Sequence, residues 1–530
     1  LDANTTADDN TAIGYAALGA NTTGEYNVAV GALALDAATT ANSNTGVGYG
    51  VLSNATTGAE NTAVGVNAAQ GTTTGANNVA IGTNALIANT TANNNVAIGS
   101  TALTSNTTGA ANTAVGATAL DAATTANYNV GIGYAALGAT TTGADNTAVG
   151  SGALEGNTTA SNNTAVGRAA LQANTTGSSL TAVGKDALAA NTTGDNNIGI
   201  GRDAGQSITE GSNNIVIGVE AYETATTANG NIAIGKGALK ANTTGSENVC
   251  IGHEAGNDIT TGAGHTLIGY LAGDKITTAS QSVAVGDEAL GANTTGSANV
   301  AVGYNAGLAM TTADNNVAVG FNCMVSTTTG TNNTAMGSRA LDAHTTSHSN
   351  ACFGYAAGGN ITTGQNNICV GSQSGITGSP GGNVTTGNNG IFLGDENIVE
   401  ANIQVDWTVA SDARDKTDVE PLKTGLNFIN KLEPVTYRWD KRSLYSKDQS
   451  ISPDGTHKED WLDTGFLAQN VEKLEEEYGY KIEDKTNLTT TLSEDGVMYG
   501  LTYSKFIPSL VKAIQELSAE VEELKSNKEE

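Results

Sequence analysis

Residues 411–416 read Ser-Asp-Ala-Arg-Asp-Lys and place a serine hydroxyl five residues before a lysine amine. A serine hydroxyl is a weak nucleophile, and a lysine serves as its base only where burial or a neighbouring cation lowers the lysine pKa. Such a pair can cut a peptide bond. The predicted chemistry is nucleophilic attack by Ser411 with Lys416 as the base. The attacked bond would adjoin Ser411 on one side or the other, at Ala410–Ser411 or at Ser411–Asp412.

The same hexapeptide also has a purely structural interpretation. Ser411 can cap a short helix that runs over Asp412 and Arg414, because serine side chains accept hydrogen bonds from the first N–H groups of a helix. On the hexapeptide alone, this second interpretation is the stronger one. Cleavage would further require an oxyanion hole, which backbone N–H groups of a nascent helix can supply.

The hexapeptide lies close to a change in composition. All three tryptophans and all five prolines lie beyond residue 379, and only seven of the 23 basic residues lie before residue 395. With 67 glycines and 5% aromatic residues, the 530-residue chain is poor material for several ordinary hydrophobic cores. A repeat architecture is therefore the better expectation for its long N-terminal part.

Charge and hydropathy exclude several classes of protein. The formal charge is −29, so the N-terminal part cannot neutralise a nucleic-acid backbone, and we expect no nucleic-acid partner. There is no run of about 18 apolar residues and no signal peptide, so we expect no membrane insertion. Because Leu1 already lies in repeat phase, we expect the sequence to be the C-terminal piece of a longer protein.

Glycines recur every 17 residues from Gly14 to Gly371, 22 in all, without an insertion or deletion. A typical unit reads Asn-Val-Ala-Val-Gly-Ala-Leu-Ala-Leu at 27–35, and the usual polar turn is Asn-Thr-Thr-Gly, as at 21–24. Alternating β-branched residues followed by Gly and Asn indicate strands and turns. One unit cannot close a core, whereas stacked coils bury a continuous one. The predicted fold is mainly β, a parallel β-solenoid (β-roll) over residues 1–371.

The pattern within a unit predicts which side chains face inward. Counted from its Asn, positions two and four are Thr, Val or Ile, as at Val79 and Ile81, and position three is small, as at Ala80. Alternation places positions two and four on one face and position three on the other. We expect Val and Ile to fill the interior, with Ala allowing a second surface to approach. Asn at position one and Gly at position five suit corners, because both tolerate a positive φ.

The four cysteines test this reading of the repeat. Cys250, Cys352 and Cys369 occupy position three, and Cys323 occupies position eight, where Ala is usual. We expect buried small hydrophobes rather than disulfides or metal ligands, and no metal or cofactor anywhere. His265 replaces a position-one Asn, and a structural role is the expectation for it. The Asn-Thr-Thr triplets match glycosylation sequons, but their recurrence as a turn explains them.

Residues 372–410 interrupt the repeat. The next equivalent glycine, Gly394, follows Gly371 by 23 residues, so six extra residues have entered one coil. Residues 398–407 alternate like a closing strand, and we expect this segment to cap the solenoid, because an open coil edge invites aggregation. Trp407 is interpreted as a capping residue, with a receptor contact at the tip as the alternative.

Residues 411–530 mix helices and strands. We predict a short helix at 422–432, a strand at 435–439 and a turn into a helix at 465–472. In the last segment, apolar residues recur at spacings of three and four and form an a/d seam: Ile507, Leu510, Ile514, Leu517, Val521 and Leu524. A helix this short is marginal alone, so the seam predicts an oligomer.

Two resemblances follow from these stretches. The unit at 78–82, Asn-Val-Ala-Ile-Gly, resembles the head repeat of bacterial trimeric autotransporter adhesins, which implies left-handed parallel β-rolls assembled three abreast. Those repeats are typically somewhat shorter than this one, so handedness and trimer contacts stay open.

Residues 411 to about 525 resemble the intramolecular chaperone at the C-terminus of phage tail spikes and fibres, the endosialidase-type self-cleaving peptidase family. The stretches that carry the resemblance are 411–416, 426–439, 465–471 and 510–517. In that family the serine is the nucleophile and the lysine five residues later is its partner, positions that Ser411 and Lys416 fill. The resemblance implies a trimeric domain that aligns three chains, nucleates their fibrous fold and releases itself by proteolysis. The resemblance favours self-cleavage over helix capping as the interpretation of residues 411–416.

Together these observations predict a structural fibre protein of a phage virion, a tail fibre or spike for host adhesion. Its parts would be a solenoid shaft at 1–371, a capping or tip segment at 372–410 and an autoprocessing chaperone domain at 411–530 that ends in a coiled-coil helix. The enzyme activity expected is one Ser-Lys self-cleavage per chain, with no external substrate. The expected partners are two further copies in a homotrimer, a host-surface receptor, and a virion attachment partner N-terminal to this sequence.

The expected location is the outer face of the virion, after synthesis in the host cytoplasm. A bacterial surface trimeric adhesin with the same chaperone is the alternative, and the polar ending Lys528–Glu530 favours the virion. A polysaccharide-degrading spike ranks last, because no concentrated pair of carboxylates stands out in the sequence.

Overall fold

The computed structural model describes residues 2–379, 381–398, 400–404, 408–445 and 451–529. The chain forms two compact units, Leu1–Ala313 and Asp314–Glu530. The division expected at residues 371 and 410 stays a prediction.

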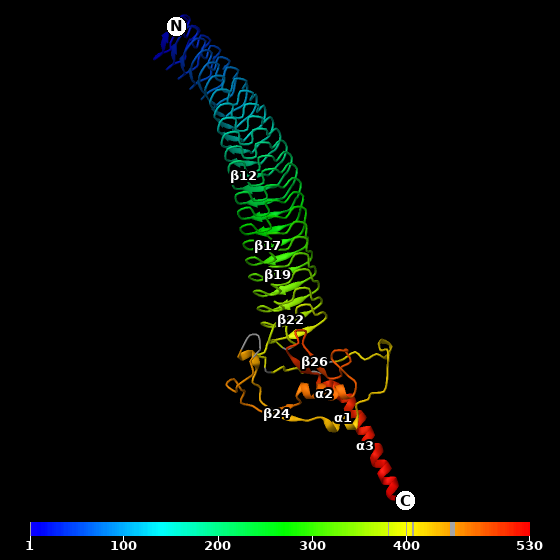
Figure 1. Ribbon diagram of the computed structural model, residues 1–530. Coiled ribbons are helices and arrows are strands. Elements are labelled where there is room, and N and C mark those ends of the chain that lie inside the picture. Colours follow the sequence, from blue (N-terminus) through cyan, green and yellow to red (C-terminus); the bar gives the residue numbers. More distant parts are fainter. Residues whose placement is uncertain (1, 380, 399, 405–407, 446–450, 530) are drawn as a thin grey trace. The chain divides into compact units, whose positions relative to one another are not determined.

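The first unit is a stack of short parallel strands, one in each repeat (Figure 1). Strands β1 to β17 each pair in register with the strand 17 residues further along the chain, so that Ala12 lies opposite Ala29. This is the parallel β-solenoid that the repeat predicts. The strands are β1 (Thr11–Ile13), β2 (Val28–Val30), β3 (Thr45–Val47), β4 (Thr62–Val64), β5 (Val79–Ile81), β6 (Val96–Ile98), β7 (Thr113–Val115), β8 (Val130–Ile132), β9 (Thr147–Val149), β10 (Thr164–Val166), β11 (Thr181–Val183), β12 (Ile198–Ile200), β13 (Ile215–Ile217), β14 (Ile232–Ile234), β15 (Val249–Ile251), β16 (Thr266–Ile268), β17 (Val283–Val285) and β18 (Val300–Val302).

The second unit begins with five strands of the same kind, β19 (Val317–Val319), β20 (Thr334–Met336), β21 (Ala351–Phe353), β22 (Ile368–Val370) and β23 (Ile391–Leu393). Strand β23 pairs with β22 across a spacing of 23 residues, Ile368 opposite Ile391, which confirms the enlarged coil. The closing strand predicted at 398–407 is wrong where the chain is described, because residues 398 and 400–404 form no strand. Trp407 lies outside the described residues.

Alanine and leucine, rather than valine and isoleucine, fill the solenoid interior. In β2 the central Ala29 is fully buried, whereas Val28 and Val30 are only partly buried. A Cβ added at Gly46, in the same position three, would lie 3.5 Å from Cδ1 of Leu35, so this position faces the buried leucines. The prediction that positions two and four face inward is therefore wrong. Alternation separates two faces of the strand without showing which one is interior. The leucines at position nine point toward position three and leave room there for only a small side chain.

Buried asparagines at position one form a ladder that joins the coils. Asn44 donates its N–H to Oδ1 of Asn27 at 3.0 Å, and its Nδ2 donates to the same oxygen at 3.2 Å and to the Gly58 carbonyl at 2.9 Å. The same three bonds recur one coil later. Positive φ falls on the residue before each asparagine, as at Ser43 (φ 58), so the corner role predicted for Asn is wrong. Its role is to satisfy buried polar groups of two neighbouring coils.

The glycine at position five keeps its predicted role. Gly14 has φ 133, a conformation that favours glycine, and a Cβ there would lie 2.5 Å from the carbonyl oxygen of Gly31. The next coil therefore packs against the face where a side chain would stand. No residue other than glycine fits this position without moving the backbone.

His265 takes the place of asparagine in the ladder. Its N–H donates to Oδ1 of Asn248 at 3.1 Å, its Nε2 lies 2.8 Å from the Ala279 carbonyl, and its Nδ1 accepts the N–H of Ser282 at 3.2 Å. Because Nδ1 accepts, the ring is neutral, and burial lowers its pKa. The structural role expected for His265 is confirmed. The cysteines are also as predicted, free and fully buried: Cys250, Cys323, Cys352 and Cys369.

The rest of the second unit is a small mixed domain of short elements. They are η1 (Ala413–Asp415), α1 (Leu426–Lys431), β24 (Val435–Tyr437), η2 (Arg442–Leu444), β25 (Asp463–Gly465), α2 (Ala468–Glu477), β26 (Thr490–Leu492), β27 (Tyr499–Leu501), η3 (Tyr503–Lys505) and α3 (Phe506–Glu529). Helix α1 is shorter than predicted, and α2 is longer. No helix in the described ranges has both the length and the apolar character needed to cross a membrane.

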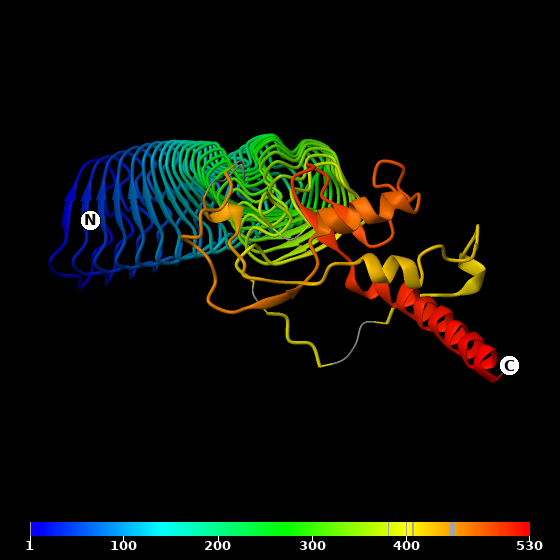
Figure 2. The same ribbon diagram turned by 60° about the horizontal axis from the view of Figure 1, so that its bottom comes forward.

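A compact core holds this domain together. It consists of Phe428 from α1, Val471 and Leu474 from α2, and Phe506 from α3. Helices α1 and α3 lie side by side (Figure 2), and the Glu516 carboxylate accepts the first N–H of α1 at 2.6 Å. The C-terminal half of α3 extends beyond the other elements of the domain (Figures 1 and 2).

The buried His344 generates a prediction about pH. It stands at a turn position where asparagine is the commonest residue, with Nε2 2.9 Å from the Ser347 carbonyl and Nδ1 2.9 Å from Oγ1 of Thr327. Burial lowers the pKa of His344 to about 4. The unfolded ring titrates near 6.5, so the stability that depends on the neutral ring is complete above that pH and is lost as pH falls towards 4.

We expect His344→Asn to remove this part of the pH dependence. The unfolding free energy of the wild type should fall by up to about 3 kcal/mol more than that of the variant over this range. Thermal unfolding of both chains at several pH values measures the difference. Parallel pH curves for the two chains would contradict the prediction.

Candidate functional site

Ser411 and Lys416 meet in the structure. The Lys416 Nζ donates a hydrogen bond to the Ser411 Oγ at 2.6 Å. Both side chains are exposed within the single chain, as are Ala410 and Asp412 on either side of the serine. The two residues predicted for the chemistry are therefore in direct contact, and both peptide bonds that adjoin Ser411 are open to solvent.

A single 3-10 turn, η1, makes this contact possible. Asp412 is its N-cap and accepts the N–H of Arg414 at 2.9 Å, while the N–H of Lys416 donates to the Ala413 carbonyl at 3.3 Å. The residue that caps the turn is thus Asp412, and the capping role considered for Ser411 is wrong. The turn closes residues 412–416 on themselves, which returns the lysine side chain to the serine.

Arg414 and Asp412 neutralise each other beside the pair. The guanidinium lies 2.6 Å from the Asp412 carboxylate, and hydrogen bonds from Arg414 lower the pKa of that carboxyl group. An arginine with its own carboxylate partner exerts little net field on a third group. The feature that would prepare a lysine to act as a base is then burial rather than a neighbouring cation.

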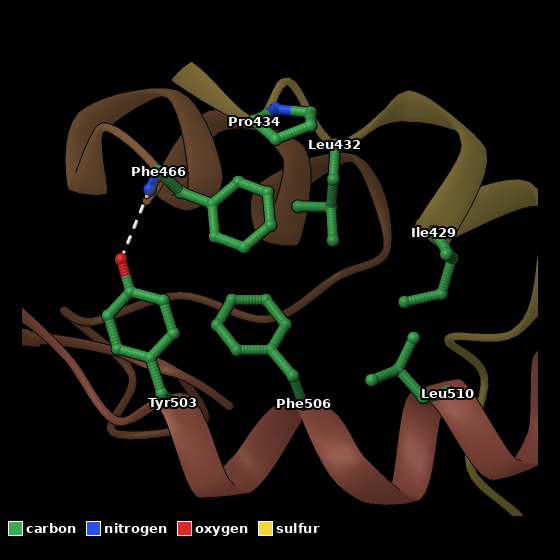
Figure 3. Close-up of a pocket in the computed structure, with 7 residues that line it drawn as sticks. All are labelled: Ile429, Leu432, Pro434, Phe466, Tyr503, Phe506 and Leu510. Atoms are coloured by element: carbon green, nitrogen blue, oxygen red, sulfur yellow. Dashed lines mark hydrogen bonds between the residues drawn. The ribbon is translucent and has the colours of Figure 1, made fainter. Parts of the chain in front are cut away.

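The part of the C-terminal domain that follows residues 411–416 in sequence contains an apolar pocket beside α3. Its lining consists of Ile429, Leu432, Pro434, Phe466, Tyr503, Phe506 and Leu510 (Figure 3). Figure 3 shows the rings of Phe466, Tyr503 and Phe506 grouped together, and Phe466 donates its N–H to the Tyr503 hydroxyl at 3.1 Å. This bond fixes the segment that leads into α2 against the start of α3.

The a/d seam predicted on the last helix lies on α3 and faces solvent. Its six residues are 41–63% exposed: Ile507, Leu510, Ile514, Leu517, Val521 and Leu524. By contrast, Phe506 and Ala513 on the same helix are buried. The helix therefore uses one side for the core of its own domain and leaves a second apolar side uncovered.

A set of hydrogen bonds joins the hairpin β26–β27 to the enlarged coil, and the sequence does not predict it. The turn of the hairpin β26–β27 carries Glu494 and Asp495, which accept hydrogen bonds from the backbone of residues 383–387, in the enlarged coil. The only local signal is the Glu-Asp-Gly sequence at 494–496, which indicates a tight turn. Nothing in it identifies a binding partner more than a hundred residues away.

Residues 411–480 match the profile of a peptidase family described as "Chaperone of endosialidase". The match begins at Ser411 and ends before the helix α3, whereas the resemblance noted above extends to about residue 525. No curated protein and no solved structure matches the chain. The chain thus carries a chaperone domain of a self-cleaving peptidase family after a β-solenoid of 17-residue repeats, a combination that fits a tail-fibre or endosialidase-type protein.

Proposed function

We propose that this protein is a homotrimeric tail fibre or spike of a phage virion that serves host adhesion. Its domain at 411–530 directs trimer folding and leaves by one self-cleavage per chain, with Ser411 as nucleophile and Lys416 as base. The observation that carries the proposal is the 2.6 Å contact between these two side chains at the first residue of the family match.

Ring size favours one of the two bonds for attack within a chain. The Ser411 Oγ reaches the Ala410 carbonyl through a five-membered ring, whereas its own carbonyl would require a strained four-membered ring. Lys416 as a free amine takes the hydroxyl proton, Oγ bonds to the Ala410 carbonyl carbon, and the C–N bond breaks as that proton passes to the leaving Ser411 nitrogen. Water then hydrolyses the ester, which gives the Ala410 carboxylate and restores the hydroxyl.

Assembly would control this chemistry. An ammonium group in water keeps its proton at neutral pH, and both residues of the pair are exposed in the single chain. Packing of three α3 helices through the exposed seam would bring the neighbouring chains close and bury the pair. Cleavage would then follow trimer formation rather than precede it.

Outward-facing valines and isoleucines give the shafts a surface on which to meet. Ile81 and Ile98 are 38% and 36% exposed at position four of successive coils, and the same pattern recurs along both units. Identical coils can pair one unit out of step at little local cost, so three such faces need a fixed starting point. The C-terminal domain would supply it.

Cleavage is tested with Ser411→Ala and Lys416→Ala. On denaturing gels the wild type should yield two fragments, residues 1–410 and 411–530, while both variants stay intact because nucleophile or base is missing. Lys423→Ala removes another exposed lysine and should cut normally. Mass spectrometry should find Ser411 at the start of the small fragment. An intact wild-type chain in folded trimers would overturn the autoprotease assignment.

The seam is tested with Ile514→Asp. This side chain is 63% exposed, so the charge should leave the domain folded but prevent three helices from packing, and both trimer and cleavage should be lost. Light scattering after size exclusion gives the oligomeric state, circular dichroism the helix content and gels the cleavage. Glu520→Asp is the matched control on the same helix. A trimeric, normally cleaved Ile514→Asp chain would refute the role of the seam.

A further inference from the structure

The turns of successive coils are joined by a repeated set of backbone bonds. In the coil before the enlarged one, the N–H groups of Thr362, Thr363 and Gly364 all donate to the carbonyl of Thr385 in the next coil, at 2.9, 3.3 and 3.2 Å. This carbonyl serves as a common acceptor for a Thr-Thr-Gly turn. The enlarged coil has the same Thr-Thr-Gly turn at 385–387, but the described residues after it form no further coil.

Glu494 supplies the acceptor that this last turn lacks. The N–H of Gly387 donates to its carboxylate at 2.8 Å, that of Thr386 at 3.1 Å and that of Thr385 at 3.4 Å. The hydroxyl of Thr386 also donates to it. The carboxylate therefore occupies the place that the Thr385 carbonyl has in the junction before it.

The enlarged coil and the hairpin turn approach each other closely at Gly382 and Ser493. A Cβ at Gly382, where φ is +76, would collide with the side chain of Ser493 in the hairpin turn, so only glycine permits the contact. Asp495 holds the turn by accepting the Ser493 hydroxyl at 2.5 Å and the Val497 N–H at 3.1 Å. It also accepts the N–H of Asn383 at 3.3 Å.

The charge state of Glu494 agrees with this geometry. Burial raises the pKa of its carboxyl group, but the bonds from Thr386, Gly387 and Thr385 together outweigh burial and lower the pKa. Three N–H groups that converge on one anion are a recurrent way in which backbone binds carboxylates and phosphates. The ionised form is thus the one the turn holds.

We propose that Thr385, Thr386 and Gly387 form a carboxylate-binding site, which Glu494 fills in the uncut chain and which release of residues 411–530 opens. The second half rests on the proposed self-cleavage, and the first half does not. In the uncut chain the site ties the chaperone domain to the last coil. In the released fibre the same three N–H groups donate hydrogen bonds to a free carboxylate.

The first half is tested in full-length chains that carry Ser411→Ala and therefore stay uncut. Hydrogen exchange of the peptide containing residues 383–390 is compared with Glu494 intact, with Glu494→Ala and with Glu494→Gln. Glu494→Ala should speed the exchange of the three amides at least about tenfold, because they lose a charged acceptor. Glu494→Gln, which keeps the shape, should give a smaller increase. Glu483→Gln, an exposed glutamate elsewhere in the domain, should change nothing.

Acetate then serves as the probe ligand. Added to the Glu494→Ala chain, it should restore slow exchange at these amides, whereas chloride at the same ionic strength should not. Unchanged exchange in Glu494→Ala, or equal restoration by chloride, would overturn the site.

The second half is tested with the cut wild-type chain after removal of the C-terminal fragment. The same amides should exchange fast and slow down with acetate, and slow exchange without acetate would overturn the opening of the site. A wild-type chain that is not cut refutes the proposed cleavage, and the opening with it, but leaves the result in the uncut variants intact.

Discussion

The solenoid depends on amides that are buried where water cannot reach them. An asparagine of the ladder accepts hydrogen bonds from the asparagine of the next coil and donates one to the turn of that coil, as Asn44 does with Asn61 and Gly58. A buried amide without a partner costs more than its hydrogen bonds return when they are made. A coil is therefore complete only between two others, and the ends of the stack are its weak points. At the last turn, after which the described residues form no further coil, the carboxylate of Glu494 supplies the acceptor.

Because the coils are so alike, the solenoid does not by itself specify how two chains align. One junction closely resembles the next, so the contacts between coils do not say which coil of one chain should lie beside which coil of another. That choice has to come from a part of the molecule that occurs once. The exposed seam of α3 and the contact between Ser411 and Lys416 both belong to such a part, because each occurs once in the chain.

The period, the strand positions and the enlarged coil could be predicted, because they depend on spacing alone. The inward face could not, since alternation separates Val28 and Val30 from Ala29 without saying which side is the interior. The decisive fact is that a leucine such as Leu35 approaches from across the coil, and this contact is invisible in a strand pattern. At the site, resemblance supplied the pairing of Ser411 with Lys416, and the structure added the turn that Asp412 caps. The role of Glu494 could not be found, because its partners lie more than a hundred residues away.

The glycines at position five have a consequence for how this gene can change. A Cβ at Gly14 would meet the carbonyl of Gly31, and a Cβ at Gly31 would meet that of Gly48, so a substitution at such a glycine, or a gain or loss of a few residues, would break the stack. Deleting or duplicating one whole repeat, in contrast, joins surfaces that already fit. Recombination between neighbouring repeats can therefore lengthen or shorten the shaft by a coil at a time and leave both ends of the protein as they were.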